Sequence, residues 1–309
     1  MTAAGGQPSG VRSHPSPVSG PALVLAAAVL WGTVGIASRL LYGIEDIPPL
    51  VVGFFRLALA VPLLGLWCWW RLGPETFRFD GSDRLRIAGI GLTMAAYQAC
   101  YFQAVADVGV ALATLITICS APVIVGILAI VLLREKVSRT VVTALGLGLI
   151  GAVLLIGTPP AEDADPVGIL WACGSALAYS GFVLLSRSLA GRHDPGKIIV
   201  TGFGAGAVML LPLAIAAGMT PGVWTGQVWS ALLYMGLVPT GLAYVLYFCG
   251  MKATQATPAS IIALAEPLTA TTLAFVLFGE RLGPSAIAGA ILLIVTMVLL
   301  VRSRPRSGW

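Results

Sequence analysis

The sequence divides into ten apolar runs, each about as long as one helix that crosses a lipid bilayer. Short charged or Pro- and Gly-containing segments separate the runs, which cover residues 21–43, 48–70, 84–106, 109–133, 139–157, 166–188, 195–218, 227–250, 254–278 and 284–302. About 20 helical residues span the hydrocarbon core. Backbone polar groups cannot stay unpaired in lipid, so such runs must be helical. The pattern predicts an all-α polytopic membrane protein with ten transmembrane helices.

The composition excludes several other classes of protein. Only 10% of the 309 residues are charged, whereas soluble domains contain about 25%. A soluble globule, a disordered chain and a nucleic-acid-binding domain are therefore excluded. The two histidines, His14 and His193, lie in a tail and a loop, and the cysteines form no CxxC pair. We expect neither a metal site nor a cofactor.

The distribution of basic residues predicts the orientation of the chain. If the amino terminus is cytoplasmic, 15 of the 18 Lys and Arg residues fall in cytoplasmic tails and loops, and Arg281 is alone in an outer loop. Cytoplasmic loops carry such an excess of cations. We expect a plasma-membrane protein with both termini in the cytoplasm, a disordered tail over 1–20 and a basic tail over 303–309.

The two halves of the chain resemble each other. Glu135 lies 13 residues after Pro122, Glu280 lies 13 residues after Pro267, and the two pairs are 145 residues apart. Further matches at similar offsets are Trp31-Gly32 with Tyr179-Ser180, Ser38-Arg39 with Ser186-Arg187, and Tyr101-Phe102 with Tyr247-Phe248. These matches predict a duplicated five-helix unit, over 21–157 and 158–302. Since five is odd, the second copy is inverted, which places a binding site near the midplane between the repeats.

These features resemble the drug/metabolite transporter superfamily, and specifically its EamA-type members. The resemblance rests on the two five-helix copies, the Trp31–Thr33 and Phe54–Arg56 segments, the paired Pro and Glu positions, and the stretch Leu264–Gly283. It implies a central cavity lined by spans one, three, four, six, eight and nine, with spans five and ten peripheral. It also implies secondary transport, often export, of a small metabolite such as an amino-acid-like or drug-like molecule.

Three charged residues lie at membrane depth, where a charge costs about 2.5–3.5 kcal/mol on insertion scales. Glu266 lies at the centre of span nine beside Pro267. It is a candidate for proton coupling, or alternatively a neutral acid in one interhelical hydrogen bond. Arg56 needs a partner, which a substrate carboxylate, backbone carbonyls or Glu266 could provide. Arg39 lies near the outer end of span one, where a gate or an ion pair with Asp107, Glu45 or Asp46 is expected.

Aromatic and amide side chains near the midplane are candidates for a substrate cavity, because aromatic residues otherwise favour the membrane interfaces. They are Trp31, Tyr97, Gln98, Tyr101, Tyr179 and Tyr244. Apolar walls with a few polar groups are usual for a small-molecule site. For any one of these residues, interhelical packing is the alternative.

A membrane-embedded enzyme acting on a lipid or prenyl substrate is the main rival hypothesis. Asp80-Gly81-Ser82-Asp83 resembles the acidic motif of prenyl transfer, but no second acidic cluster faces it, and a turn is the simpler reading. The sequence has no P-loop, so ATP does not drive transport in this chain. Small-residue faces at Gly202 with Gly206 and at Ser285 with Gly289 favour close helix packing or a homodimer. The sequence specifies neither the substrate nor its direction.

Overall fold

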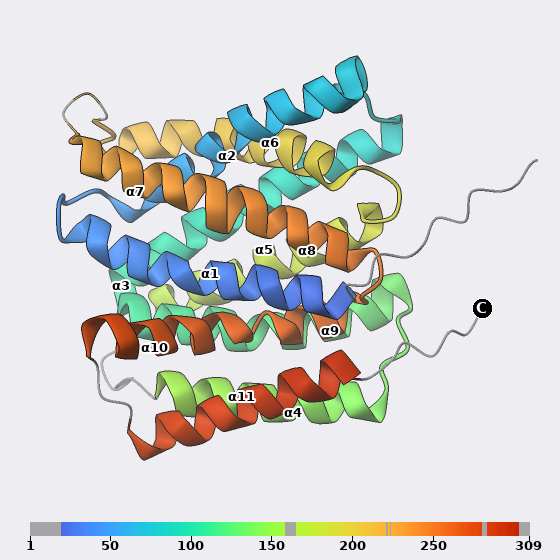
Figure 1. Ribbon diagram of the computed structural model, residues 1–309, viewed down its shortest axis with the longest axis vertical. Helices are drawn as coiled ribbons and strands as arrows, with labels where there is room; N and C mark the ends of the chain where they lie inside the picture. Colours follow the sequence, from blue (N-terminus) through green and yellow to red (C-terminus); the bar gives the residue numbers. More distant parts are fainter. Residues whose placement is uncertain (1–19, 158–164, 221, 223, 280–282, 303–309) are drawn as a thin grey trace, which may run out of the picture.

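The computed structural model describes residues 20–157, 165–220, 222, 224–279 and 283–302, which form a bundle of helices joined by short loops (Figure 1). The tails up to residue 19 and from 303, the loop acids Glu162 and Asp163, and Glu280 with Arg281 lie outside these residues. No β-strand occurs in the part of the chain that is described.

The helices follow the apolar runs of the sequence. They are α1 (Gly20–Tyr42), α2 (Pro49–Leu72), the 3-10 helix η1 (Gly73–Phe77), α3 (Gly81–Leu133), α4 (Arg139–Ile156), α5 (Pro166–Leu189), α6 (Pro195–Ala216), α7 (Gly226–Gly236), the π-helical segment η3 (Leu237–Leu242), α8 (Ala243–Met251), α9 (Ala256–Ile262), α10 (Ala265–Phe278) and α11 (Pro284–Arg302). Nine stretches of the described chain are long and apolar enough to cross a membrane. The remaining expected span, 84–106, lies in the first part of α3. The prediction of an all-helical polytopic protein is confirmed.

Gly109, at the start of the fourth expected span, separates it from the third within α3. Its φ of 79° and ψ of 162° interrupt the 53 residues of α3, and glycine adopts positive φ without steric cost. The chain reverses there, because Asp83 before the break and Glu135 after it both meet the last turn of α5 and its following loop. A Cβ atom on Gly168, near the start of α5, would instead contact Asp107 beside the break.

Contacts between distant segments define two ends of the bundle. At the basic end, Arg71 lies 3.9 Å from Asp194, and Arg187 lies 4.0 Å from Glu135. The described chain both begins at α1 and ends at α11 on this side, which is at the right of Figure 1. The α1–α2 loop, the end of α6 and the start of α7 lie at the opposite end.

Asp83 holds the basic end together. Its buried carboxylate accepts hydrogen bonds from Arg86 at 2.7 Å and Arg192 at 2.8 Å, and lies 2.7 Å from His193 Nε2. The bond to His193, with the two arginines, holds the pKa of this carboxyl below its ordinary value. Asp83 of the Asp80–Asp83 motif is thus occupied by cationic side chains of the protein itself, and it ties α3 to the α5–α6 loop.

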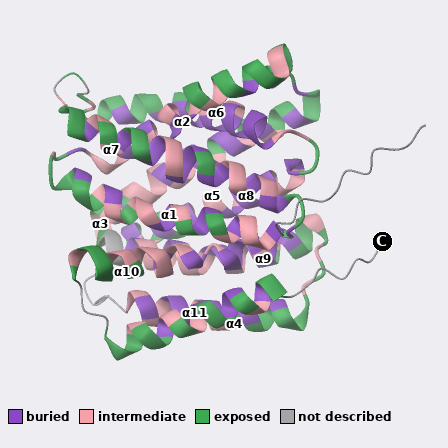
Figure 2. Cartoon of the chain, viewed as in Figure 1, coloured by how far each residue is buried: buried purple, intermediate pink, exposed green. Residues whose placement is uncertain are grey.

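The outer surface of the bundle is apolar, as lipid contact requires. Large apolar side chains on α2, α6 and α11 are exposed (Figure 2), among them Leu63, Leu66, Val208 and Ile291. A soluble protein of this size does not expose such a continuous apolar surface. These side chains are exposed because the lipid bilayer, and not water, surrounds this surface.

Gly32 allows α1 and α10 to pack in direct contact. A Cβ atom at Gly32 would lie 2.6 Å from Thr269 Cβ and 2.7 Å from the Glu266 carbonyl oxygen. Neither atom is the end of a flexible side chain, so α10 itself would have to move. Gly35, one turn later on the same helix, has nothing within 4 Å of an added Cβ.

We expect Gly32→Ala to lower the free energy of unfolding by about 1–3 kcal/mol, the usual cost of overpacking. Gly35→Ala is the matched control and should raise it by about 0.5–1 kcal/mol, because alanine is the better helix former. Thermal unfolding in detergent measures both. Equal stability of the two variants would contradict the close contact of α1 with α10.

Candidate functional site: a cavity between α1, α3 and α10

A cavity of about 1030 Å³ extends from the middle of the bundle to the end opposite the basic loops. Glu266 and Ser260 line its inner part, and Tyr42, Gly43 and Pro49 line it at the α1–α2 loop. Among the described residues, none from the basic-end loops contributes to the wall. The cavity therefore opens toward one end and is closed toward the other.

Most of the wall comes from α1, α3 and α10, as the family resemblance implies for spans one, three, four and nine, and span six adds Tyr179 from α5. Two differences are clear. Span two contributes Arg56 and Val52, whereas span eight contributes only Met235. The peripheral spans five and ten also reach the wall, through Leu155 and Ala286.

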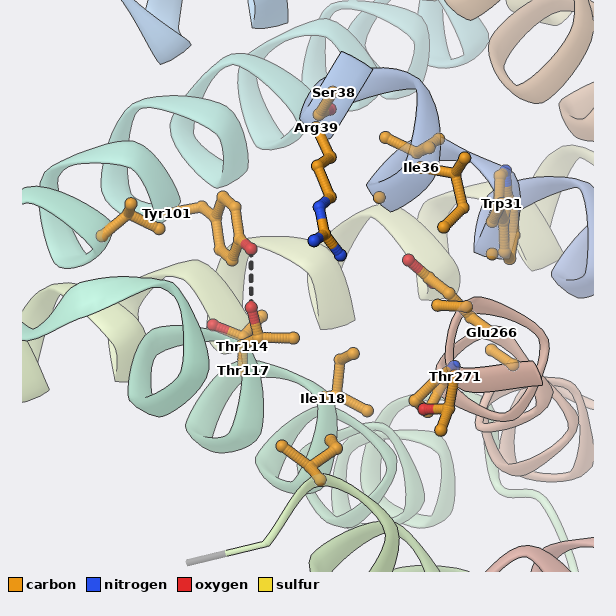
Figure 3. Close-up of a pocket in the computed structure, with 18 of the residues that line it drawn as sticks. Trp31, Ile36, Ser38, Arg39, Tyr101, Thr114, Thr117, Ile118, Glu266 and Thr271 are labelled. Carbon is orange, nitrogen blue, oxygen red and sulfur yellow. Dashed lines mark hydrogen bonds between the residues drawn. The ribbon is translucent and has the colours of Figure 1, made fainter. Parts of the chain in front are cut away.

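Glu266 lies at a break in span nine. Helix α9 ends at Ile262 and α10 begins at Ala265. Pro267 has no N–H to donate to the Ala263 carbonyl, and the Glu266 amide donates to that oxygen at 2.9 Å instead. The tightened turn presents the Glu266 carboxyl group to the cavity (Figure 3). The sequence prediction of a polar notch beside Pro267 corresponds to this break.

Arg56 reaches the cavity from α2 and finds its partner on span eight. Its Nε donates to Thr240 Oγ1 at 3.4 Å, and that hydroxyl donates to the Met235 carbonyl at 2.8 Å. Both partners belong to the distorted stretch around Pro239, where α7 passes into the π-helical η3. Proline has no N–H, so Pro239 leaves the Met235 carbonyl without its helical donor. The Thr240 hydroxyl donates to this carbonyl instead, and Arg56 donates to the hydroxyl.

Arg39 reaches the cavity from α1. Its guanidinium carbon lies 4.1 Å from the centre of the Phe278 ring, a cation–π contact with the end of α10. In Figure 3 the guanidinium and the Glu266 carboxyl group point into the same space from two helices. The cavity thus contains cationic and acidic groups, Arg39 and Arg56 with Glu266.

Tyrosines form the aromatic part of the wall. The Tyr97 ring centroid lies 5.5 Å from that of Tyr179 and 6.1 Å from that of Tyr101. The Tyr101 hydroxyl is hydrogen-bonded to Thr114 Oγ1 at 2.7 Å, across the break at Gly109 (Figure 3). Trp31 closes the wall on the α1 side. The structure therefore brings together four of the six aromatic and amide candidates.

Gln98 and Tyr244 lie outside the lining. Gln98 is buried between helices, where a Cβ on Gly53 would lie 3.4 Å from its amide carbon. The Tyr244 ring packs 4.9 Å from Trp31 and 4.8 Å from Phe203, and is buried behind the wall. For these two residues the structure favours the packing alternative. Position along a span specifies membrane depth, but it does not specify which face of the helix meets the cavity.

Several lining residues were not singled out from the sequence. They are the hydroxyl-bearing side chains Ser38, Tyr42, Thr114, Thr117, Ser260 and Thr271. Serine and threonine occur throughout the spans, and most satisfy their hydroxyl within their own helix, as Thr269 does with the Ala265 carbonyl at 3.0 Å. Their position within about two turns of a proline or of Gly109 could have indicated Thr114, Thr117, Ser260 and Thr271, but no such signal marks Ser38.

Comparison with known proteins identifies relatives over nearly the whole chain. Residues 18–157 and 166–302 match the EamA-like transporter family. The uncharacterized transporter YwfM of Bacillus subtilis is 31% identical over 286 residues, which cover 92% of this chain and 94% of the relative. An uncharacterized transporter of Archaeoglobus fulgidus is 31% identical over 92% of this chain and 96% of its own. A solved crystal structure with 22% identity superposes with a TM-score of 0.76, covering 90% and 95% of the two chains, and shares the fold.

The cavity predicts which introduced cysteines react with water-soluble thiol reagents. With the five native cysteines replaced by alanine, Ser38→Cys and Thr271→Cys should be labelled in detergent, since both positions line the cavity. Ser175→Cys is the matched control and should stay unlabelled, because Ser175 is fully buried. Mass spectrometry of the intact protein measures the labelling. Protection of both cavity positions would contradict a water-filled space.

Proposed function

This chain belongs to the EamA-like transporter family, and on that premise we propose that it moves a small metabolite through the described cavity by alternating access. It is a multi-pass membrane transporter and not an enzyme, as the family and the relatives named transporters indicate. The observation that carries the proposal is the cavity itself. It contains charged side chains at mid-bundle, opens to one end of the protein and is closed to the other.

The chemistry of the wall favours an amino-acid-like or drug-like substrate. Two guanidinium groups can bind a carboxylate, and Glu266 can bind an amine. The Tyr97, Tyr101 and Tyr179 rings offer an apolar surface for the rest of the molecule. Uptake and efflux of a metabolite panel in proteoliposomes, with and without a proton gradient, test the function. Concentrative movement of a panel member supports the proposed transport. If the folded protein concentrates no member of the panel, the proposal is contradicted.

Export across the plasma membrane is the direction we propose. The excess of Lys and Arg at the basic end supports a cytoplasmic location for that end and for both termini. In this arrangement the cavity seen here opens outward.

The two stretches matched by the family, 18–157 and 166–302, support the division into two five-helix repeats.

The orientation can be tested with single cysteines in a cysteine-free variant. We expect Thr220→Cys, in the exposed loop before α7, to react with an impermeant thiol reagent added to intact cells. Arg78→Cys is the control at the basic end, where the Arg78 side chain is 72% exposed. It should react only in inverted vesicles. The reverse pattern would place the basic end outside and contradict the proposed direction of opening.

Glu266 is our candidate for proton coupling. Its carboxyl group lies in the wall, where it can exchange a proton with the water of an open cavity. Binding and release of that proton would then accompany the change in the end to which the cavity opens. Arg56 and Arg39 line the same space and supply positive charge when Glu266 is ionised.

We expect Glu266→Gln to abolish proton-driven accumulation, because glutamine resembles the protonated acid and cannot release a proton. Substrate exchange should be retained, because the amide still fills the site and its oxygen can accept a hydrogen bond from a substrate amine. Accumulation and exchange are measured separately in proteoliposomes. Glu75→Gln removes an exposed carboxylate at the basic end, away from the cavity, and is the control that should leave both unchanged. Accumulation by Glu266→Gln equal to the unmodified protein across the pH range would contradict the coupling role.

A further inference from the structure

A second buried carboxylate, Glu135, lies outside the cavity at the basic end of the bundle. It belongs to the link between α3 and α4, and its side chain is only 8% exposed. Its Oε1 accepts the Ala256 amide at 2.8 Å, and its Oε2 accepts the Thr257 amide and hydroxyl, both at 3.3 Å. These three hydrogen bonds connect residues that are more than 120 positions apart in the chain.

Arg187 completes the cluster from α5. Its Nε lies 4.0 Å from Glu135 Oε1, and its Nη1 donates to the Met251 carbonyl at the end of α8 at 2.9 Å. The α3–α4 link, α5, the end of α8 and the start of α9 therefore meet at one ion pair. Each half of the sequence contributes to it, Glu135 from the first and Arg187, Met251, Ala256 and Thr257 from the second.

The cluster fixes the segment that separates the cavity from the basic end. Helix α9 is only seven residues long and runs from the Glu135 contacts to the break before Glu266. Ser260 and Ala263, farther along the same segment, line the cavity. A displacement of α9 would therefore change both the closure at the basic end and the turn that positions Glu266.

We propose that Glu135 is the latch of a gate at the basic end: its contacts with α9 and Arg187 keep the cavity closed there, and their release opens it to that end. This inference rests on the alternating access of the proposed function. The hydrogen bonds involve a charged acceptor and are stronger than neutral ones, but they are few and lie at one point. Such a contact can be made in one state and broken in the other without disturbing the apolar packing of the bundle.

The test measures accessibility and needs no substrate. Two reporters are placed in the cysteine-free protein: Ser38→Cys in the cavity wall of α1, and Ser260→Cys on α9. An impermeant thiol reagent is added to intact cells and to inverted vesicles, so that the two ends are probed separately. In the unlatched variant Glu135→Gln we expect Ser260→Cys to become reactive from the basic end and Ser38→Cys to lose reactivity from the other.

The expected change in each labelling rate is about tenfold, since a tenfold population shift corresponds to about 1.4 kcal/mol, and charge-assisted hydrogen bonds can contribute that much. Glu75→Gln is the matched control. It removes an exposed basic-end carboxylate that forms an ion pair with Arg78 at 2.9 Å, and it should label like the unmodified protein. Unchanged labelling in folded Glu135→Gln overturns the latch.

If Glu135→Gln does not fold, Arg187→Gln provides the test, because it removes the ion pair and leaves the three hydrogen bonds of Glu135 in place. It should shift labelling in the same direction by a smaller factor, and unchanged labelling would then overturn the proposal. The outcome is separate from the proposed function. A labelling shift without transport of any panel member contradicts the transport proposal alone, whereas transport with unshifted labelling contradicts the latch alone.

Discussion

The constraint on which this structure depends is that backbone polar groups have no water to bind within a bilayer. Every interruption of a helix must therefore be compensated by another group of the protein. At Pro239 the compensation comes from the Thr240 hydroxyl, which donates to the Met235 carbonyl and accepts from Arg56. Before Pro267 it comes from the Glu266 amide, which donates to the Ala263 carbonyl. Arg56 and Glu266 thus meet irregular backbone, which is tolerated at membrane depth where it lines a cavity.

The same breaks determine the form of the cavity. Continuous helices that pack along their whole length leave no space between them, as the close contact of α4 with α11 illustrates. There a Cβ on Gly289 would lie 2.5 Å from the Gly151 carbonyl oxygen. Span nine, in contrast, consists of two short helices, and α3 reverses at Gly109. Around these points the wall includes Tyr101 with Thr114, and Glu266, so that polar groups face a space that apolar packing does not fill.

The sequence alone predicted the architecture closely, because each span is long and its ends are marked by Pro, Gly or charge. The helix ends at Tyr42, Ile156 and Phe278 lie within a few residues of the predicted ones. The site was predicted in part. Glu266 and Arg56 could be found because a charged residue in an apolar run is costly unless it has a partner or a function. Tyr244, in contrast, could not be distinguished from Tyr97 by its position in the sequence. The direction of a side chain depends on the rotation of its helix against neighbours, which the apolar pattern of a lipid-exposed span does not fix.

Span nine connects the two ends of the molecule. Its basic end is fastened through Ala256 and Thr257 to Glu135, its middle turns at Ala263 to present Glu266, and its other end places Phe278 against Arg39. A rigid helix would move as one body, and its middle could not change independently of its ends. The break permits α9 and α10 to move separately, while Gly32 keeps α10 in contact with α1. The carboxylate that binds α9 and the carboxylate in the cavity are therefore linked by a short segment, so that a change in the contacts of one can affect the position of the other.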